Sequence, residues 1–140
     1  MSPKRKLAVL FATALLTARL APAAPTETVH VTYHVKPGKL DEFLTALKEH
    51  HPACLKLGLV LEQPHLILSG MEDGKPVVIE ILTWKDSDAP DSVPGHHPEI
   101  KAIWDRLNAL VEKRDGKRGI EIEEMDIVAG AARPKKATRK

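Results

Sequence analysis

The chain has 140 residues, 43% of them hydrophobic and 29% charged, a composition that fits one globular domain and excludes a disordered or collagen-like protein. Its single cysteine, Cys54, excludes an intramolecular disulfide and a thiolate-rich zinc cluster. Four basic residues lie in 1–23 and five in 133–140, so the net charge of +2 leaves −7 between these two segments. A body of that sign repels phosphate backbones, and the sequence therefore predicts no nucleic-acid partner.

The first 23 residues have the three parts of a secretory signal peptide. Residues 4–6 are basic, 7–16 are largely apolar, and Ala21 and Ala23 suit a small-residue cleavage site. The apolar run is about half as long as a membrane-spanning helix needs to be. We therefore expect an exported, periplasmic or secreted protein with no membrane association after cleavage.

A strand and a helix are predicted next. Over 28–35 apolar residues alternate with polar ones, which predicts a strand with its valines on one face and His30 and His34 on the other. After a turn at Pro37-Gly38, apolar residues recur at helical spacing from Leu40 to Leu47, and Pro52 is expected to end this helix.

A hairpin is predicted in the middle of the chain. Two β-rich runs, 59–70 and 76–84, are separated by a polar connection that contains Asp73-Gly74. This pair tolerates the positive φ angles of tight hairpin turns. The stretch 85–95, rich in proline, aspartate and serine, is predicted to be a loop.

The last elements are a helix and a strand. Pro98 suits the first turn of a helix whose apolar stripe runs to Val111, and Gly116 ends it. A strand is predicted over 120–128. The domain thus occupies 24–130, and we expect 131–140 to be a disordered basic tail.

The predicted order is β-α-β-β-α-β, which is typical of ferredoxin-like α+β domains. We expect a four-stranded antiparallel sheet with two helices on one face. The other face would need its own cover, and Val78, Leu82 and Trp84 would be exposed on it if Glu80 points away from the helices. Because a small domain with few aromatic residues has a thin core, the sequence predicts a homodimer that pairs sheet to sheet.

Two stretches resemble antibiotic biosynthesis monooxygenase (ABM)-like domains of the dimeric α+β barrel superfamily. One is Val29 to Lys39 (VHVTYHVKPGK) with Phe43 in the helix that follows, and the other is 80–86 (EILTWKD) with the loop and helix near His96 and His97. The resemblance covers about residues 28–128. It implies a dimeric barrel whose two sheets enclose a cavity. Members of this superfamily include cofactor-independent oxygenases of aromatic polyketides, haem-degrading enzymes and proteins with no known reaction.

Three residues are predicted to carry chemistry: His30, His34 and Glu80. The two histidines point to the same side of one strand, which in a dimeric barrel is the cavity side. Glu80 lies within an apolar strand, where an ionisable group must be paired or must shift its pKa. A histidine oriented by Glu80 could act as a general base on an activated phenol. The alternative is that these residues face solvent or line the cavity without a chemical role.

Four further residues are predicted to bind ligand: His65, Trp84, His96 and His97. His65 would partner a cavity histidine, and Trp84 would stack on a flat molecule. His96 and His97 precede a helix and would lie at the cavity mouth, or cap and solvate that helix. No metal site and no cofactor are assigned to the chain.

These observations predict an exported protein that binds a small molecule in the cavity of an ABM-like dimeric barrel. The resemblance implies a cofactor-independent monooxygenase with a small aromatic or partly apolar substrate. Two alternatives stay open. One is a ligand-binding or assembly module without turnover, and the other is a haem- or metal-binding protein that uses its histidines.

Overall fold

The computed structural model describes residues 24–130. The predicted leader, 1–23, and the predicted tail, 131–140, lie outside the described residues, so export stays a prediction. Within 24–130, none of the helices has both the length and the apolar character that a membrane crossing requires.

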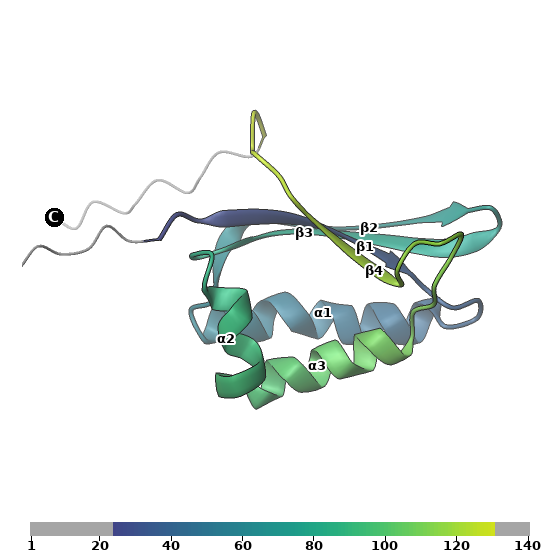
Figure 1. Ribbon diagram of the computed structural model, residues 1–140, viewed down its shortest axis with the longest axis horizontal. Helices are drawn as coiled ribbons and strands as arrows, with labels where there is room; N and C mark the ends of the chain where they lie inside the picture. The colour runs from purple at the N-terminus through teal and green to yellow at the C-terminus, as the bar shows by residue number, and fades with distance from the viewer. Residues whose placement is uncertain (1–23, 131–140) are drawn as a thin grey trace, which may run out of the picture.

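Seven elements follow one another along the chain: β1 (Glu27–His34), α1 (Leu40–Lys56), β2 (Val60–Glu72), β3 (Lys75–Trp84), α2 (Ala89–His96), α3 (Pro98–Ala109) and β4 (Ile120–Glu124). The four strands form one sheet in the order β2-β3-β1-β4, and all neighbouring strands are antiparallel. The helices lie together on one side of this sheet, and the chain after β4 rises on the other side (Figure 1). The predicted α+β, ferredoxin-like fold with a four-stranded antiparallel sheet is confirmed.

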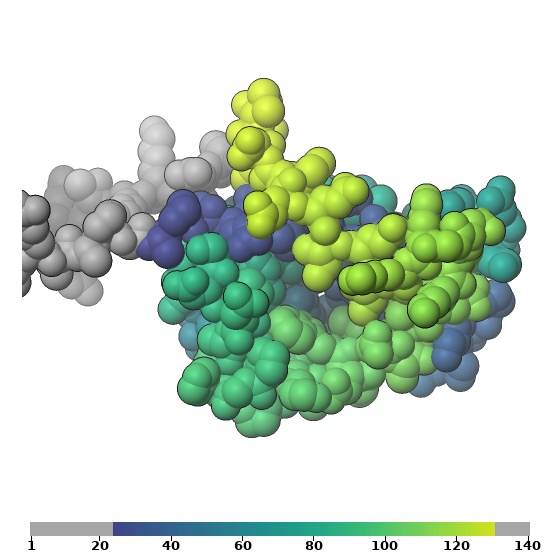
Figure 2. All heavy atoms as spheres, in the orientation of Figure 1, coloured from purple at the N-terminus to yellow at the C-terminus, as the bar shows by residue number. Residues whose placement is uncertain are grey.

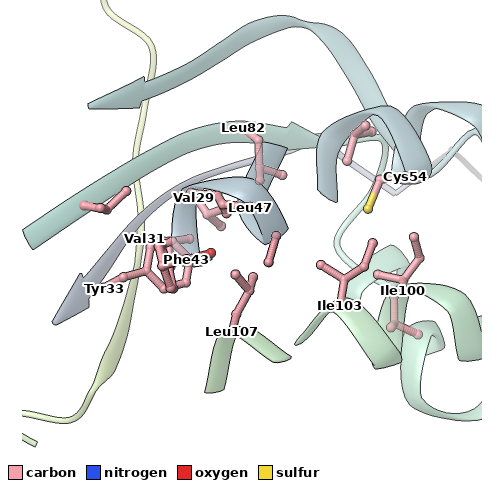
Figure 3. Close-up of a cluster of buried hydrophobic side chains, with 14 of the residues drawn as sticks. Val29, Val31, Tyr33, Phe43, Leu47, Cys54, Leu82, Ile100, Ile103 and Leu107 are labelled. Atoms are coloured by element: carbon pink, nitrogen blue, oxygen red, sulfur yellow. The ribbon is translucent and has the colours of Figure 1, made fainter. Parts of the chain in front are cut away.

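The core lies between the sheet and the helices, as the alternation over 28–35 predicts. Val29, Val31 and Tyr33 of β1 are buried and face Phe43 and Leu47 of α1, as Figure 3 shows. The predicted hairpin is also present. Its two turn residues, Asp73 and Gly74, have φ angles of 50° and 76°, the positive values that a type I′ turn requires.

The first helix is longer than predicted, because Pro52 does not end it. α1 continues to Lys56 with Pro52 on its exposed side. A proline in a helix interior removes one hydrogen bond. Here the buried side of the helix runs past it, through Leu47, His50 and Cys54, and the packing of these side chains keeps the last turn in place.

The stretch predicted as a loop, 85–95, contains most of a helix instead. α2 begins at Ala89, and Pro90 occupies its first turn, where the missing N–H has no intrahelical acceptor to lose. Ala89 and Val93 are buried. These two apolar residues anchor a short helix that the polar composition of the stretch conceals.

The side chain of Glu80 in β3 points to the inner face of the sheet, and not to the outer face that was considered from the sequence. Glu80 lies opposite Val31 in the β1–β3 ladder, and residues directly opposite each other point to the same face. Glu80 therefore points toward the helices, together with Val78 and Leu82. The consequence is that any site built on Glu80 lies inside one subunit rather than between two sheets.

Candidate functional site

A cavity of about 500 Å³ lies between the sheet and α3. Figure 2 looks onto the side of the molecule where α3 and β4 border it. Its walls are mostly apolar and aromatic, from the valines of β1 to α3 and β4: Val29, Val31, Leu82, Trp84, Trp104, Leu107, Ile120 and Ile122. A cavity of this size and character suits a small organic ligand.

Glu80 forms the polar floor of the cavity. Its side chain is fully buried, and it accepts hydrogen bonds from the Tyr33 hydroxyl at 3.2 Å and from His50 Nδ1 at 3.1 Å. Burial by itself raises the pKa of this carboxyl, but its interactions with His50, His65 and Tyr33 outweigh burial and lower the pKa from 4.5 to about 2. Glu80 is therefore an ionised carboxylate at neutral pH.

His50 comes from α1 and connects Glu80 to the aromatic wall. Its Nε2 lies 2.9 Å from Nε1 of Trp104. An indole N–H can only donate, so Nε2 presents its lone pair to Trp104, and Nδ1 carries the proton that is donated to Glu80. This contact requires the neutral imidazole in one tautomer, with the proton on Nδ1, and so it opposes protonation of Nε2.

Cys54 and Glu80 favour the protonated form of His50, whereas the contact with Trp104 opposes protonation. Burial lowers the proton affinity of this imidazole, but its interactions with Cys54 and Glu80 are larger in sum and raise the pKa of His50 to about 10. The indole of Trp104 occupies the one nitrogen that could take the proton. The arrangement is a carboxylate–imidazole pair whose basic atom is covered by one aromatic side chain.

The aromatic rings around His50 form a compact group. The ring centroids of His50, Trp84 and Trp104 are each 6.3 Å from one another, and the two indoles meet edge to face at 88°. Such geometry is favourable between aromatic rings. A flat ligand in the cavity would contact the same indole surfaces.

The rim of the cavity is acidic. Glu27, Asp91 and Asp105 line it beside Asn108. Desolvation and the nearby carboxylates of Glu124 and Asp91 raise the pKa of Glu27. A rim of this charge disfavours the entry of anionic ligands.

His30 and His34 lie on the other face of the sheet from Glu80, so the prediction of one site shared by these three residues is wrong. Neighbouring residues of a strand point to opposite faces, and Val31 is the residue that shares the face of Glu80. On the outer face His34 Nε2 lies 2.8 Å from Glu121, and His30 Nδ1 lies 3.9 Å from Glu123.

Of the four predicted ligand-binding residues, two lie at the cavity or beside Glu80 and two do not. Trp84 lines the cavity, and His65 Nε2 lies 3.7 Å from Glu80 Oε2. His96 ends α2 and is exposed, and His97 joins α2 to α3. Neither of these two lines the cavity between the sheet and α3, in the part of the chain that the structure describes.

Three residues of the site were not identified from the sequence: His50, Tyr33 and Trp104. The signal for His50 is its position seven residues after Phe43 and three after Leu47, which continues the buried stripe of α1. The prediction that the helix ends at Pro52 placed His50 at a helix end and hid this pattern. Within 24–130, no three His, Cys, Asp or Glu side chains are arranged to hold a metal ion.

Comparisons with known proteins define the class of fold. No protein-family model matches the sequence, and no curated protein matches it. Among solved structures, the cofactor-independent oxygenase SnoaB from Streptomyces nogalater is 19% identical with a TM-score of 0.56, over 79% of this chain and 99% of SnoaB. The fold is thus that of the ABM-like, ferredoxin-fold proteins.

Two further structures match over nearly their whole length. A conserved protein from Methanosarcina mazei is 22% identical with a TM-score of 0.54, over 71% of this chain and 90% of its own. A dimeric ferredoxin-like protein of unknown function from Jannaschia sp. is 19% identical with a TM-score of 0.53, over 73% of this chain and 99% of its own. At these identities the likeness shows the fold alone.

The charge of Glu80 leads to a prediction about acid stability. Since the pKa of Glu80 is about 2 in the folded protein and 4.5 otherwise, its charge stabilises the fold above pH 4.5, and this stabilisation is lost as the pH falls toward 2. The shift corresponds to on the order of 3 kcal/mol. In urea unfolding, Glu80→Gln should therefore be less stable than the wild type at neutral pH, and the difference should shrink below pH 4.5. The exposed Glu62→Gln variant is the control, and an equal acid response in all three proteins would contradict the assignment.

The contact between Trp104 and His50 leads to a second prediction. The indole N–H stabilises only the neutral imidazole, so Trp104→Phe should raise the pKa of His50 above its wild-type value. An NMR titration of the His50 ring proton measures this change. Trp84→Phe is the matched control, because Trp84 lies at the same ring distance from His50. The same change in both variants would show that packing, not the hydrogen bond, sets the pKa.

Proposed function

We propose that this protein binds a small, flat, largely apolar molecule with an acidic O–H group and oxidises it with O2 as a cofactor-independent monooxygenase. The observation that carries the proposal is the buried pair of Glu80 and His50, which places one basic nitrogen, Nε2, at an apolar cavity. Such a nitrogen is suited to accept a proton from a bound phenol.

The first step is a proton transfer to His50. The substrate displaces the Trp104 indole from Nε2, and its hydroxyl donates there in place of the indole. The O–H bond breaks, an N–H bond forms at Nε2, and Glu80 stabilises the imidazolium from the Nδ1 side. The apolar walls keep water from the phenolate that results.

The second step uses the phenolate as the reductant. One electron passes to O2, and the radical and superoxide join at an activated ring carbon to form a peroxide. The peroxide takes a proton, and water leaves with the hydrogen of that carbon, so a carbonyl forms there. One O2 supplies the new carbonyl oxygen and the oxygen of one water, and no other reductant is needed.

Two features support this choice of substrate. The indoles of Trp84 and Trp104 offer flat surfaces for an aromatic ring. The acidic rim disfavours anions, so the substrate would enter as a neutral phenol and lose its proton inside. That SnoaB is a cofactor-independent oxygenase agrees with the proposal.

A binding module without turnover is the second candidate. One observation favours it: Trp104 occupies the basic nitrogen, so the cavity has no free base until a ligand moves the indole. A ligand that leaves Trp104 in place would be bound and not oxidised.

The test uses anthrone, whose enol tautomer is a phenol. Binding is measured without oxygen by quenching of tryptophan fluorescence, because both tryptophans of the chain line the cavity. Turnover is then measured as O2 uptake and formation of anthraquinone. His50→Gln should bind anthrone and lose at least about a hundredfold in kcat, since a general base contributes that much.

His34→Gln, on the outer face, is the control and should keep the wild-type rate. If the wild type binds anthrone and does not oxidise it, the monooxygenase proposal is refuted and only the passive binding module remains. Turnover that survives in His50→Gln would refute His50 as the base.

We also propose that a second copy of the chain covers the outer face of the sheet. This face exposes Leu66 and Leu68, each 47% accessible, and the segment after β4 adds Met125 and Ile127 to it. Exposed apolar groups gathered on one face are typical of an interface. The dimeric ferredoxin-like protein from Jannaschia sp. supports this proposal.

Light scattering after gel filtration tests the dimer. The wild type should have twice the mass of one chain, and Leu68→Glu should have the mass of one chain, because it places a charge in the apolar face. Leu55→Glu, at a residue that is 39% exposed on α1 behind the sheet, should stay dimeric. A wild type with the mass of a single chain would rule out the proposed interface.

A further inference from the structure

The carboxylate of Glu80 has neighbours in two directions, and only one direction is toward the cavity. Its Oε1 atom accepts from Tyr33 and His50, which both line the cavity, and His50 Nδ1 also lies 3.2 Å from Oε2. Its Oε2 atom lies 3.7 Å from Nε2 of His65, which does not line that cavity. The carboxylate therefore stands between the ligand side and a third group on its far side.

His65 extends from Glu80 toward solvent. It lies on β2, the strand at one edge of the sheet, and pairs with Leu82, so it is a diagonal neighbour of Glu80 on the helix-facing side. Its side chain is 23% exposed, whereas that of Glu80 is fully buried. The Nε2 atom is buried and has no hydrogen-bond partner among residues 24–130. His65 thus has its Nε2 atom turned toward a carboxylate, while the rest of its side chain is partly exposed to solvent.

The orientation of the His65 ring is held by a second histidine. The rings of His51 and His65 stack with centroids 3.8 Å apart and planes 8° apart. His51 in turn donates from Nε2 to the Leu61 carbonyl at 3.0 Å, which fixes its own ring. Burial lowers the pKa of His51, so its ring is neutral and supports His65 without repelling a charge on it.

We propose that His65 is a proton port, which links the buried pair of Glu80 and His50 to solvent at the β2 edge while the ligand closes the other side. The inference rests on the proposed function, and it adds a route for the proton that the ligand gives up. It differs from the sequence-based expectation that His65 binds ligand.

The route conserves every proton. The ligand proton bonds to His50 Nε2, the Nδ1 proton of His50 passes to Oε2 of Glu80, 3.2 Å away, and the proton then passes from Oε2 to His65 Nε2. His65 then releases a proton from Nδ1 to water. The gap of 3.7 Å between Glu80 and His65 must close by about 0.5 Å to reach hydrogen-bond distance, which a small rotation of the partly exposed ring provides. The same route in reverse supplies the proton that the peroxide requires.

The experiment compares variants of His65 in the turnover of anthrone. His65→Phe keeps a flat ring that can stack on His51, and His65→Gln keeps a polar group, but neither can relay a proton. Both should bind anthrone within twofold of the wild type and turn over at least tenfold more slowly. His30→Phe is the matched control, since His30 has a similarly exposed side chain, 25%, on the opposite face of the sheet.

Chemical rescue separates a proton port from a structural role. Added imidazole should accelerate turnover by His65→Ala several-fold, because the vacated site is open to solvent, and it should leave His30→Ala unchanged. A wild-type rate in His65→Phe or His65→Gln overturns the proposal, and so does a slow His65→Ala that imidazole does not accelerate. A wild type that does not oxidise anthrone at all refutes the proposed function instead, before any variant is made.

Discussion

The burial of one carboxylate organises this molecule. A charged group inside a protein is unstable unless other groups pair with it and hydrogen bond to it, and Glu80 is fully buried. Its partners come from three different elements: Tyr33 from β1, His50 from α1 and His65 from β2. The same contacts that make the charge tolerable therefore hold the first helix against three strands of the sheet. They also leave a polar group at the floor of an otherwise apolar cavity.

The position of the site on strands and a helix, rather than on loops, gives it a fixed geometry. The tautomer of His50 is set on one side by Glu80 and on the other by the indole N–H of Trp104. Both neighbours come from regular elements, so the imidazole has little freedom to turn. Trp104 differs from Glu80 and His50 in being only half-buried, at the cavity wall. In the proposed reaction Trp104 is the group that the substrate displaces, so the other members of the site can keep their positions.

Alternation in β1 and β4 and the helical stripes of α1 and α3 predicted these four elements, because each has one polar and one apolar side, whereas the short α2 was not predicted. The face of Glu80 could not be read in this way. In β3 the residues on both sides of it, from Val77 to Leu82, are apolar, so no polar face marks the solvent side. Pairing with β1 decides the face, since Val31 lies opposite Glu80. The same limit applies to His50, which becomes visible only when the helix is allowed to pass Pro52.

The sequence predicts a site between two paired sheets, whereas Glu80 points toward the helices of its own chain. The candidate site lies between the sheet and the helices of a single chain, on the face opposite the exposed leucines. The outer face, with His30 and His34 among its polar groups, has a different character: exposed leucines and histidine–glutamate contacts. Pairing through that face would shield apolar surface and stiffen the sheet that carries Glu80, but it would add no group to the cavity. A partner subunit would therefore affect stability, whereas the proposed chemistry would depend on Glu80 and His50 of one chain, so a monomeric variant could keep the proposed reaction.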